Sequence, residues 1–192
     1  MTALPFILAS SSPRRLTLLA DIGITPERVL PAEIDETPRK GERPAVLAKR
    51  LAFEKGAVIA AQNPQALVLA ADTVVAVGLR LLPKAEGPED VRRFLRLMEG
   101  RRHRVTTAVA LFRPQAKPLE RLSTSFVTFK HLSDQEIEAY VQTGEGIGKA
   151  GGYAIQGRAA CLIRAMQGSY SGIVGLPLFD VAQMLKSAGV LA

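Results

Sequence analysis

The segment from Ala66 to Val77, ALVLAADTVVAV, predicts a strand in which a single carboxylate, Asp72, interrupts an otherwise apolar sequence. An ionised carboxylate in such surroundings is costly unless it is paired, hydrogen-bonded or bound to a cation. We therefore expect Asp72 near a strand end and facing a cleft, as a metal ligand or a general base. The alternative is an aspartate that caps a turn.

Strand-like and helical patterns alternate along the chain. Strands are predicted at residues 4–10, 27–30, 66–77, 103–112, 119–131 and 160–166, with a short partner strand ending near residue 83. Helices are predicted at residues 13–21, 45–61, 88–99, 133–142 and 178–187. Because the two patterns interleave and some strands are adjacent, we expect an α/β fold with a mixed β-sheet and flanking helices. The length of 192 residues predicts one domain over residues 1–192.

The composition excludes several classes of protein. With 47% hydrophobic and 22% charged residues the chain is typical of a globular protein, and its apolar runs are too short to span a bilayer. The first residues lack the pattern of a signal peptide, so we expect a cytoplasmic protein. Cys161 is the only cysteine, which excludes an internal disulfide and a thiolate-rich zinc site.

The formal net charge of +7 favours anionic partners such as nucleotides or nucleic acid. Much of this charge lies in two clusters, RRFLR at Arg92–Arg96 and RRHR at Arg101–Arg104. A solvated basic face explains these clusters equally well. Tryptophan is absent and aromatic residues make up only 5%, which argues against a stacking platform for single-stranded nucleic acid.

The turn SSSPRR follows directly on the first predicted strand. Ser12 is a suitable N-cap and Pro13 a suitable first residue for a helix, whose free N–H groups and dipole form a site for an anion. Arg14 and Arg15 lie in the first helical turn, where the dipole disfavours positive charge, so a bound anion can compensate them. Plain capping, with the arginines bonded to nearby carboxylates, is the alternative.

Two lysines also occupy informative positions. Lys55 falls on the same helical face as Leu47, Leu51 and Val58, near Glu54, so it points into a cleft or extends to water along the apolar face. Lys84 ends a short strand in LLPKAEG and can reach a phosphate, although lysines at strand ends are common.

A polar loop and a glycine-rich segment complete the candidates. Glu36 lies in EIDE, where paired carboxylates can hold Mg²⁺ together with substrate phosphates, or simply face solvent. The segment from Gly144 to Gly157 is either a flexible loop or a close approach of the backbone to a ligand, with the Gln156 amide able to donate and accept. We expect His103 and His131 to be structural.

Taken together, these segments resemble the Maf family of nucleoside triphosphate pyrophosphatases. The matching segments appear in the family's order: LASSSPRR, EIDE, FEKG, AADTVV, LLPKAEG, GRRHRVTTAV, GKAGGYAIQG and GIVGLPL. The resemblance implies two lobes around a deep cleft, similar to the inosine-triphosphate pyrophosphatases, and a homodimer. It implies Mg²⁺- or Mn²⁺-dependent cleavage of a nucleoside triphosphate substrate between the α and β phosphates, giving a monophosphate and pyrophosphate.

The resemblance also implies a role for each matching residue. Ser10, Arg14 and Arg15 match the phosphate-binding turn, and Lys84 matches the family's second lysine. Glu36, Lys55 and Asp72 match the catalytic positions, Asp72 and Glu36 also being those associated with the metal. Gln156 matches the residue that reads the base, in a form similar to the branch acting on dTTP and UTP. Ala85 departs from the family, which usually has proline there.

Two alternatives remain at this point. The chain is a pyrophosphatase of the 7-methyl-GTP type, although that branch has a different sequence around Gln156. Otherwise it is a regulator of septum formation that binds nucleic acid or a partner through its positive charge. Such binding would give Asp72 no role.

Overall fold

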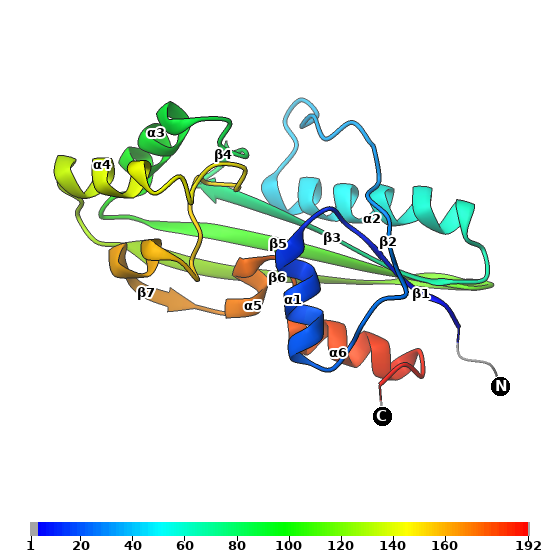
Figure 1. Cartoon of the computed structure of the whole chain (residues 1–192). Helices are drawn as coiled ribbons and strands as arrows, with labels where there is room; N and C mark the ends of the chain where they lie inside the picture. The colour runs from blue at the N-terminus through cyan, green and yellow to red at the C-terminus, as the bar shows by residue number, and fades with distance from the viewer. Residues whose placement is uncertain (1–3, 192) are drawn as a thin grey trace.

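The computed structural model describes residues 4–191, in which one mixed sheet carries the whole architecture (Figure 1). The strand order is β2-β1-β3-β5-β6-β7, and β4 pairs with β3 outside this order. The strands are β1 (Phe6–Ala9), β2 (Arg28–Val29), β3 (Leu67–Val77), β4 (Arg80–Leu82), β5 (Arg102–Arg113), β6 (Ala116–Phe129) and β7 (Ile163–Gln167). The β1 strand pairs in parallel with β2 and β3, and the other pairings are antiparallel. The prediction of an α/β fold with a mixed sheet is confirmed.

Helices lie on both faces of this sheet (Figure 1). The α-helices are α1 (Pro13–Asp21), α2 (Pro44–Gln62), α3 (Pro88–Met98), α4 (Asp134–Gln142), α5 (Tyr170–Val174) and α6 (Leu178–Ser187). Side chains of β3 alternate between the two faces, so Val68 and Ala70 pack near α2, whereas Leu69 and Ala71 pack against α1 and α6. This burial on both sides explains why β3 carries apolar side chains on both of its faces.

The α2 helix lies unusually close to the sheet because of Gly56. A Cβ atom at Gly56 would lie 2.3 Å from the Phe112 ring and 3.2 Å from the Ala70 side chain. Any larger residue would therefore push the helix away from β3. The close contact fixes the neighbouring Lys55 over the centre of β3.

The core divides into groups at the two ends of the long strands. One group packs α3 and α4 against β3, β5 and β6 around Phe94, Phe129 and Ile137. The other packs α1, α2 and α6 around β1 and the first half of β3. These are the two lobes expected from the resemblance, and the main cavity lies between them.

An interruption along one edge of β3 opens the sheet to this cavity. The pairing of β1 with β3 ends at Ala70, and the pairing of β4 with β3 begins at Val75. Within residues 4–191, the positions from Ala71 to Val74 therefore have no partner strand on this edge. The prediction that Asp72 lies near a strand end is wrong, because Asp72 is at the centre of β3. Asp72 nevertheless faces a cleft, because the neighbouring strands β1 and β4 stop short of it.

Most predicted elements are present, with three local differences. Ser133 and Glu136 form the predicted capping box of α4, and α6 has the predicted bounds. The Ser12 side chain makes no capping bond to α1, although Pro13 begins the helix as predicted. Residues 158–162, partly predicted as strand, form a 3₁₀-helix before β7. The short helix α5 falls outside the helices predicted from the sequence.

One further prediction concerns α2, where Leu47, Leu51 and Lys55 are buried but Val58 is 38% exposed. Lys55 therefore points inward, and the snorkelling alternative is wrong. Across residues 4–191 the longest apolar helices fall short of what a membrane crossing requires.

Candidate active site

A cavity of about 300 Å³ collects every residue that the sequence singles out for chemistry. These residues are Ser10, Arg14, Arg15, Glu36, Lys55, Asp72, Lys84 and Gln156. They come from the turn after β1, the first turn of α1, the loop before α2, α2 itself, β3, the segment after β4 and the glycine-rich loop. Segments that are far apart in sequence thus meet at the open edge of β3.

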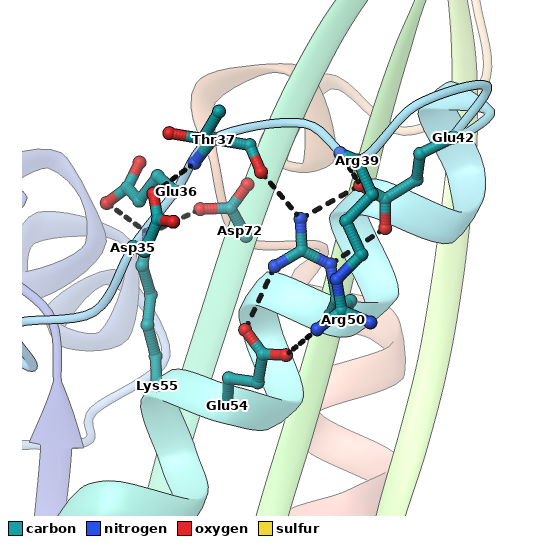
Figure 2. Close-up of polar contacts among 9 residues, drawn as sticks. All are labelled: Asp35, Glu36, Thr37, Arg39, Glu42, Arg50, Glu54, Lys55 and Asp72. Atoms are coloured by element: carbon teal, nitrogen blue, oxygen red, sulfur yellow. Dashed lines mark hydrogen bonds and ion pairs between the residues drawn. The ribbon is translucent and has the colours of Figure 1, made fainter.

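Lys55 joins the two carboxylates at the centre of the cavity (Figure 2). Its Nζ atom lies 2.6 Å from Asp72 Oδ1 and 2.8 Å from Glu36 Oε1. Lys55 and Asp72 are both buried, at 8% and 7% exposure. The charge of Asp72 in its apolar strand is therefore compensated by a direct ion pair, as its sequence context requires.

Glu36 also contacts a second lysine from the opposite side. Its Oε2 atom lies 3.3 Å from Lys84 Nζ, in an exposed ion pair. Burial raises the pKa of Glu36, but the hydrogen bond and charge of Lys55 and the charge of Lys84 outweigh it and hold the pKa below its ordinary value. Glu36 is thus anionic at neutral pH and bridges two cations.

Arg50 holds the irregular loop that carries Glu36 (Figure 2). Its guanidinium donates to Glu42 at 2.8 Å, to Glu54 at 3.0 Å and to the Thr37 carbonyl at 3.1 Å. The Thr37 N–H in turn donates to Asp35 Oδ1 at 2.9 Å. Glu54, which the helical pattern placed near the apolar face, instead anchors this loop from α2. The loop is fixed by ion pairs rather than by secondary structure.

The turn after β1 is organised by Ser10 rather than by Ser12. Ser10 Oγ accepts the Ser12 N–H at 3.1 Å and Arg15 Nη1 at 3.0 Å. Arg15 Nε donates to the Gly175 carbonyl at 2.8 Å. These partners are neutral oxygens, not the carboxylates of the alternative explanation. Burial lowers the pKa of both Arg14 and Arg15, a cost that a bound anion relieves.

The glycine-rich loop is anchored rather than free. The Gly148 N–H donates to the Ala85 carbonyl at 2.8 Å, and the Ala85 N–H donates to the Lys149 carbonyl at 3.1 Å. The backbone is also packed against itself, since a Cβ at Gly146 would lie 2.2 Å from the Gly152 carbonyl oxygen. Gln156 emerges from this support with an exposed side chain at the cavity.

Tyr153 links this loop to the sheet through a buried histidine. Tyr153 OH lies 2.8 Å from His103 Nε2, and both rings pack against Phe129. Burial lowers the pKa of His103 to about 4, so the ring is neutral at physiological pH. Its place beneath the cavity wall agrees with the structural role predicted for it.

Residues 5–188 match the sequence profile of the family described as Maf-like protein. The chain belongs to this family. It is 55% identical over 183 residues to the dTTP/UTP pyrophosphatase of Zymomonas mobilis, covering 95% of this chain and 91% of that protein. It is 54% identical over 183 residues to the dTTP/UTP pyrophosphatase of Caulobacter vibrioides, covering 95% of each. A solved nucleoside-triphosphatase/dITP/XTP pyrophosphatase from Mycobacterium abscessus aligns at TM-score 0.44 and 17% identity, over 66% of this chain and 74% of that one, too partial a likeness to carry a conclusion.

The cavity of this Maf-like protein contains polar residues that the sequence did not single out, among them Thr73, Lys149 and Tyr153. Lys149 lies within GKAGGYAIQG, a segment considered in the sequence only for its glycines and Gln156. With Lys149, five cationic side chains face two carboxylates, which leaves an excess of three positive charges. Such an excess suits a polyanion such as a triphosphate.

The two carboxylates that the sequence predicts as metal ligands, Asp72 and Glu36, meet at Lys55. Within residues 4–191, His, Cys, Asp and Glu side chains form no group of three or more that could hold a metal ion. Magnesium in phosphate chemistry is usually held by one or two carboxylates, with water and substrate phosphates as the other ligands. The Maf-like cavity therefore fits an ion that binds together with a nucleotide, not one enclosed by protein.

Proposed function

We propose that this Maf-like protein hydrolyses dTTP and UTP to the nucleoside monophosphate and pyrophosphate. The observation that carries the proposal is the Lys55 ammonium bonded to Asp72 and Glu36 inside a cavity with an excess of positive charge. The relatives named dTTP/UTP pyrophosphatase, at 54–55% identity over almost the whole chain, support the same substrates.

In the proposed reaction, water attacks the α-phosphorus in line with the bond to the bridging oxygen. A new phosphorus–oxygen bond forms, the bond to the bridging oxygen breaks, and pyrophosphate leaves with that electron pair. Asp72 orients the water and accepts its proton. Lys55 holds Asp72 and Glu36 in place at 2.6 Å and 2.8 Å, so this geometry precedes substrate binding.

The cations of the cavity stabilise the charge that develops during the reaction. Arg14 and Arg15 emerge from the turn after β1, and Lys84 approaches from the end of β4. Guanidinium groups bind phosphate oxygens in pairs, whereas a lysine contributes a single mobile charge. Donors placed in advance around a reacting phosphate lower the barrier by a few kcal/mol each, about 3 kcal/mol for one strong contact.

Asp72 and Glu36 would hold the Mg²⁺ or Mn²⁺ ion, which when bound supplies charge neutralisation for the phosphates. Each carboxylate uses one or both oxygens on lysines, so a bound ion would have to share these anionic groups with Lys55. An enzyme stripped with a chelator should therefore regain activity in proportion to added Mg²⁺ or Mn²⁺.

Gln156 selects the base in this proposal. Its amide offers a donor and an acceptor side by side, which match the adjacent carbonyl and N–H of uracil and thymine. Cytosine presents the opposite polarity at that edge, so an amide oriented for uracil or thymine would form neither hydrogen bond with it. The segment that leads to Gln156 is anchored to Ala85 by the backbone hydrogen bonds of Gly148 and Lys149.

The experiment is a phosphate-release assay with coupled inorganic pyrophosphatase on dTTP, UTP, CTP, ATP, GTP and 7-methyl-GTP. We expect turnover of dTTP and UTP at the highest kcat/KM. Turnover of 7-methyl-GTP alone would assign the other branch of the family. Absence of turnover with every triphosphate, together with salt-dependent binding of nucleic acid, would replace the enzyme by a binding protein.

The proposal includes a homodimer in the cytoplasm, which the family resemblance supports. Light scattering coupled to size-exclusion chromatography tests the dimer. A mass near that of the 20.6 kDa chain would contradict it.

A further inference from the structure

Arg50 does not line the cavity, but it forms a clamp with Glu42 and Glu54 beside the loop that supplies Glu36 (Figure 2). Its Nε and Nη2 atoms donate to the two carboxylate oxygens of Glu42, both at 2.8 Å, and its Nη1 atom donates to Glu54 at 3.0 Å. The side chains of Arg50 and Glu42 are 11% and 6% exposed, so water competes little for this bidentate pair. A further bond, from Nη2 to the Thr37 carbonyl at 3.1 Å, reaches the residue directly after Glu36.

Backbone hydrogen bonding does not hold this loop. In the described part of the chain, residues 31–37 make no hydrogen bond after Leu30 to another backbone group. The Thr37 N–H donates to Asp35 Oδ1 at 2.9 Å, which closes a local turn around Glu36. Among the described residues, the bond from Arg50 is the one that links the backbone of this stretch to another element. Ordering an irregular stretch costs conformational entropy, which contacts of this kind have to offset.

One helix therefore holds the loop at two neighbouring points. Arg50 of α2 bonds to the backbone of Thr37, and Lys55 of α2 bonds to the side chain of Glu36 at 2.8 Å. Ile34 packs against an apolar cluster that includes residues of α2, but apolar contacts have no preferred direction. The polar contacts are the ones that can orient a carboxylate.

Glu36 needs this support because its side chain is 41% exposed. Its pair with Lys84 is open to solvent, and exposed ion pairs hold a side chain weakly. The ammonium group of Lys55 is a point charge on a flexible stem, so by itself it does not fix the direction of a carboxylate. The orientation of Glu36 therefore depends on the backbone that carries it.

We propose that Arg50 is a positioning residue, which through the Thr37 carbonyl fixes the backbone at Glu36 and so orients that carboxylate toward the reacting nucleotide. The inference rests on the proposed function, in which Glu36 takes part in the reaction. It goes beyond the anchoring of the loop, because it makes turnover depend on a side chain that does not line the cavity. Arg50 acts only through Glu36.

A double-mutant cycle on kcat for dTTP tests this dependence. Arg50→Lys keeps the positive charge but loses the planar fork that bonds both oxygens of Glu42 and also reaches the Thr37 carbonyl. We expect kcat to fall about 10- to 100-fold, because displacement of a reacting group by about 1 Å has a cost of this size. In a Glu36→Gln background, which is itself slow, the same change should lower kcat by less than about 2-fold, since no carboxylate is left to orient.

Arg92→Lys is the matched control. Arg92 forms the same kind of bidentate pair, with Glu138 at 2.5 Å and 2.7 Å, and joins α3 to α4 away from the cavity. This variant should lose some thermal stability and keep its kcat. A loss of kcat in Arg92→Lys equal to that in Arg50→Lys would overturn the inference, since any weakened ion pair would then have the same effect.

Limited proteolysis measures the loop independently of activity. Trypsin can cleave after Arg39 and Lys40, which are exposed in this loop. Because cleavage follows local opening, we expect it to be several-fold faster in folded Arg50→Lys and unchanged in Arg92→Lys. Mass spectrometry of the fragments identifies the cleaved bond. Unchanged cleavage in Arg50→Lys would overturn the inference, because the clamp would then not order the loop.

The kinetic outcomes separate this inference from the proposed function. A folded Arg50→Lys with near-normal kcat, or with an effect that multiplies in full with that of Glu36→Gln, would overturn the inference alone. Normal kcat in Glu36→Gln would overturn it too, since Arg50 would have no reacting group to position. Absence of turnover in the unmodified protein would contradict the proposed function instead. If Arg50→Lys does not fold, Glu42→Gln, which weakens the clamp but keeps Arg50, replaces it in the same cycle.

Discussion

Lys55 Nζ lies 2.6 Å from Asp72 Oδ1 and 2.8 Å from Glu36 Oε1, so one buried ammonium group holds a carboxylate of the sheet and a carboxylate of a loop. The arrangement solves the energetic problem that Asp72 poses within β3. It also places both carboxylates where a triphosphate can approach them.

Asp72→Asn should fold normally and lose turnover by about 100-fold or more in kcat, the usual size of a general-base contribution. The fold survives because Glu36 still pairs with Lys55 at 2.8 Å. Steady-state kinetics with dTTP and a thermal melt check both statements. Asp35→Asn is the matched control, since Asp35 bonds to the Thr37 N–H and does not line the cavity. Near-normal kcat in Asp72→Asn would show that its assigned role is wrong.

Gln156→Ala should weaken base selection more than phosphate binding. We expect the ratio of kcat/KM for UTP over CTP to fall about 10-fold, while inhibition by pyrophosphate stays unchanged. The exposed Gln167 on β7 provides the control variant, Gln167→Ala. Equal losses for all bases would remove Gln156 from base recognition.

Glu42 should make stability depend on pH in the acid range. The hydrogen bond from Arg50 lowers its pKa from 4.5 to about 2. A carboxyl group whose pKa is lower in the folded than in the unfolded chain stabilises the fold at pH values above its unfolded pKa. The contribution of Glu42 is therefore present above pH 4.5 and is lost as the pH falls toward 2. Glu42→Gln should melt lower at pH 7 and show a smaller decrease in Tm between pH 4.5 and 2. The exposed Glu120→Gln should keep the original profile, and an identical profile for Glu42→Gln would contradict the prediction.

His103 should make the free energy of unfolding depend on pH in a higher range than Glu42 does. Burial lowers its pKa from 6.5 to about 4, so the unfolded chain binds a proton before the folded one does. Stability therefore falls as the pH decreases from 6.5 to 4, by on the order of 3 kcal/mol for a shift of this size. His103→Gln should lose this part of the pH dependence in urea unfolding, whatever its stability at pH 7. His131→Gln, at an exposed position, is the control. A steep slope that persists in His103→Gln would place its origin elsewhere.

Local sequence signals were sufficient for most of the fold. Residues typical of helix ends and apolar periodicity predicted the bounds of α1, α4 and α6, because each of these helices buries one apolar face. Of the three, α4 also has a side-chain cap, the Ser133–Glu136 capping box. The helix α5 was not predicted, since its serines and glycine are typical of a turn and its stability comes from contacts such as Thr107 to the Gly172 carbonyl. Those contacts join distant segments and leave no local pattern.

The site shows the same limit more clearly. Asp72 was found because a charge within an apolar strand needs a partner, but the partner could not be derived from spacing alone. Lys55 comes from another element, and only the close packing of Gly56 on β3 brings it there. Thr73, which lines the same cavity, was missed because a threonine is ordinary in a strand.

The continuity of β3 has a mechanical consequence. This strand contributes residues to both groups of the hydrophobic core, from Leu67 to Val75, and it pairs with β5 along nearly its full length. A hinge between the lobes would have to bend or break that ladder of hydrogen bonds, so the ladder opposes a rigid-body separation of the lobes. Under the proposed function, a nucleotide would therefore enter past exposed side chains that line the cavity, such as Lys84.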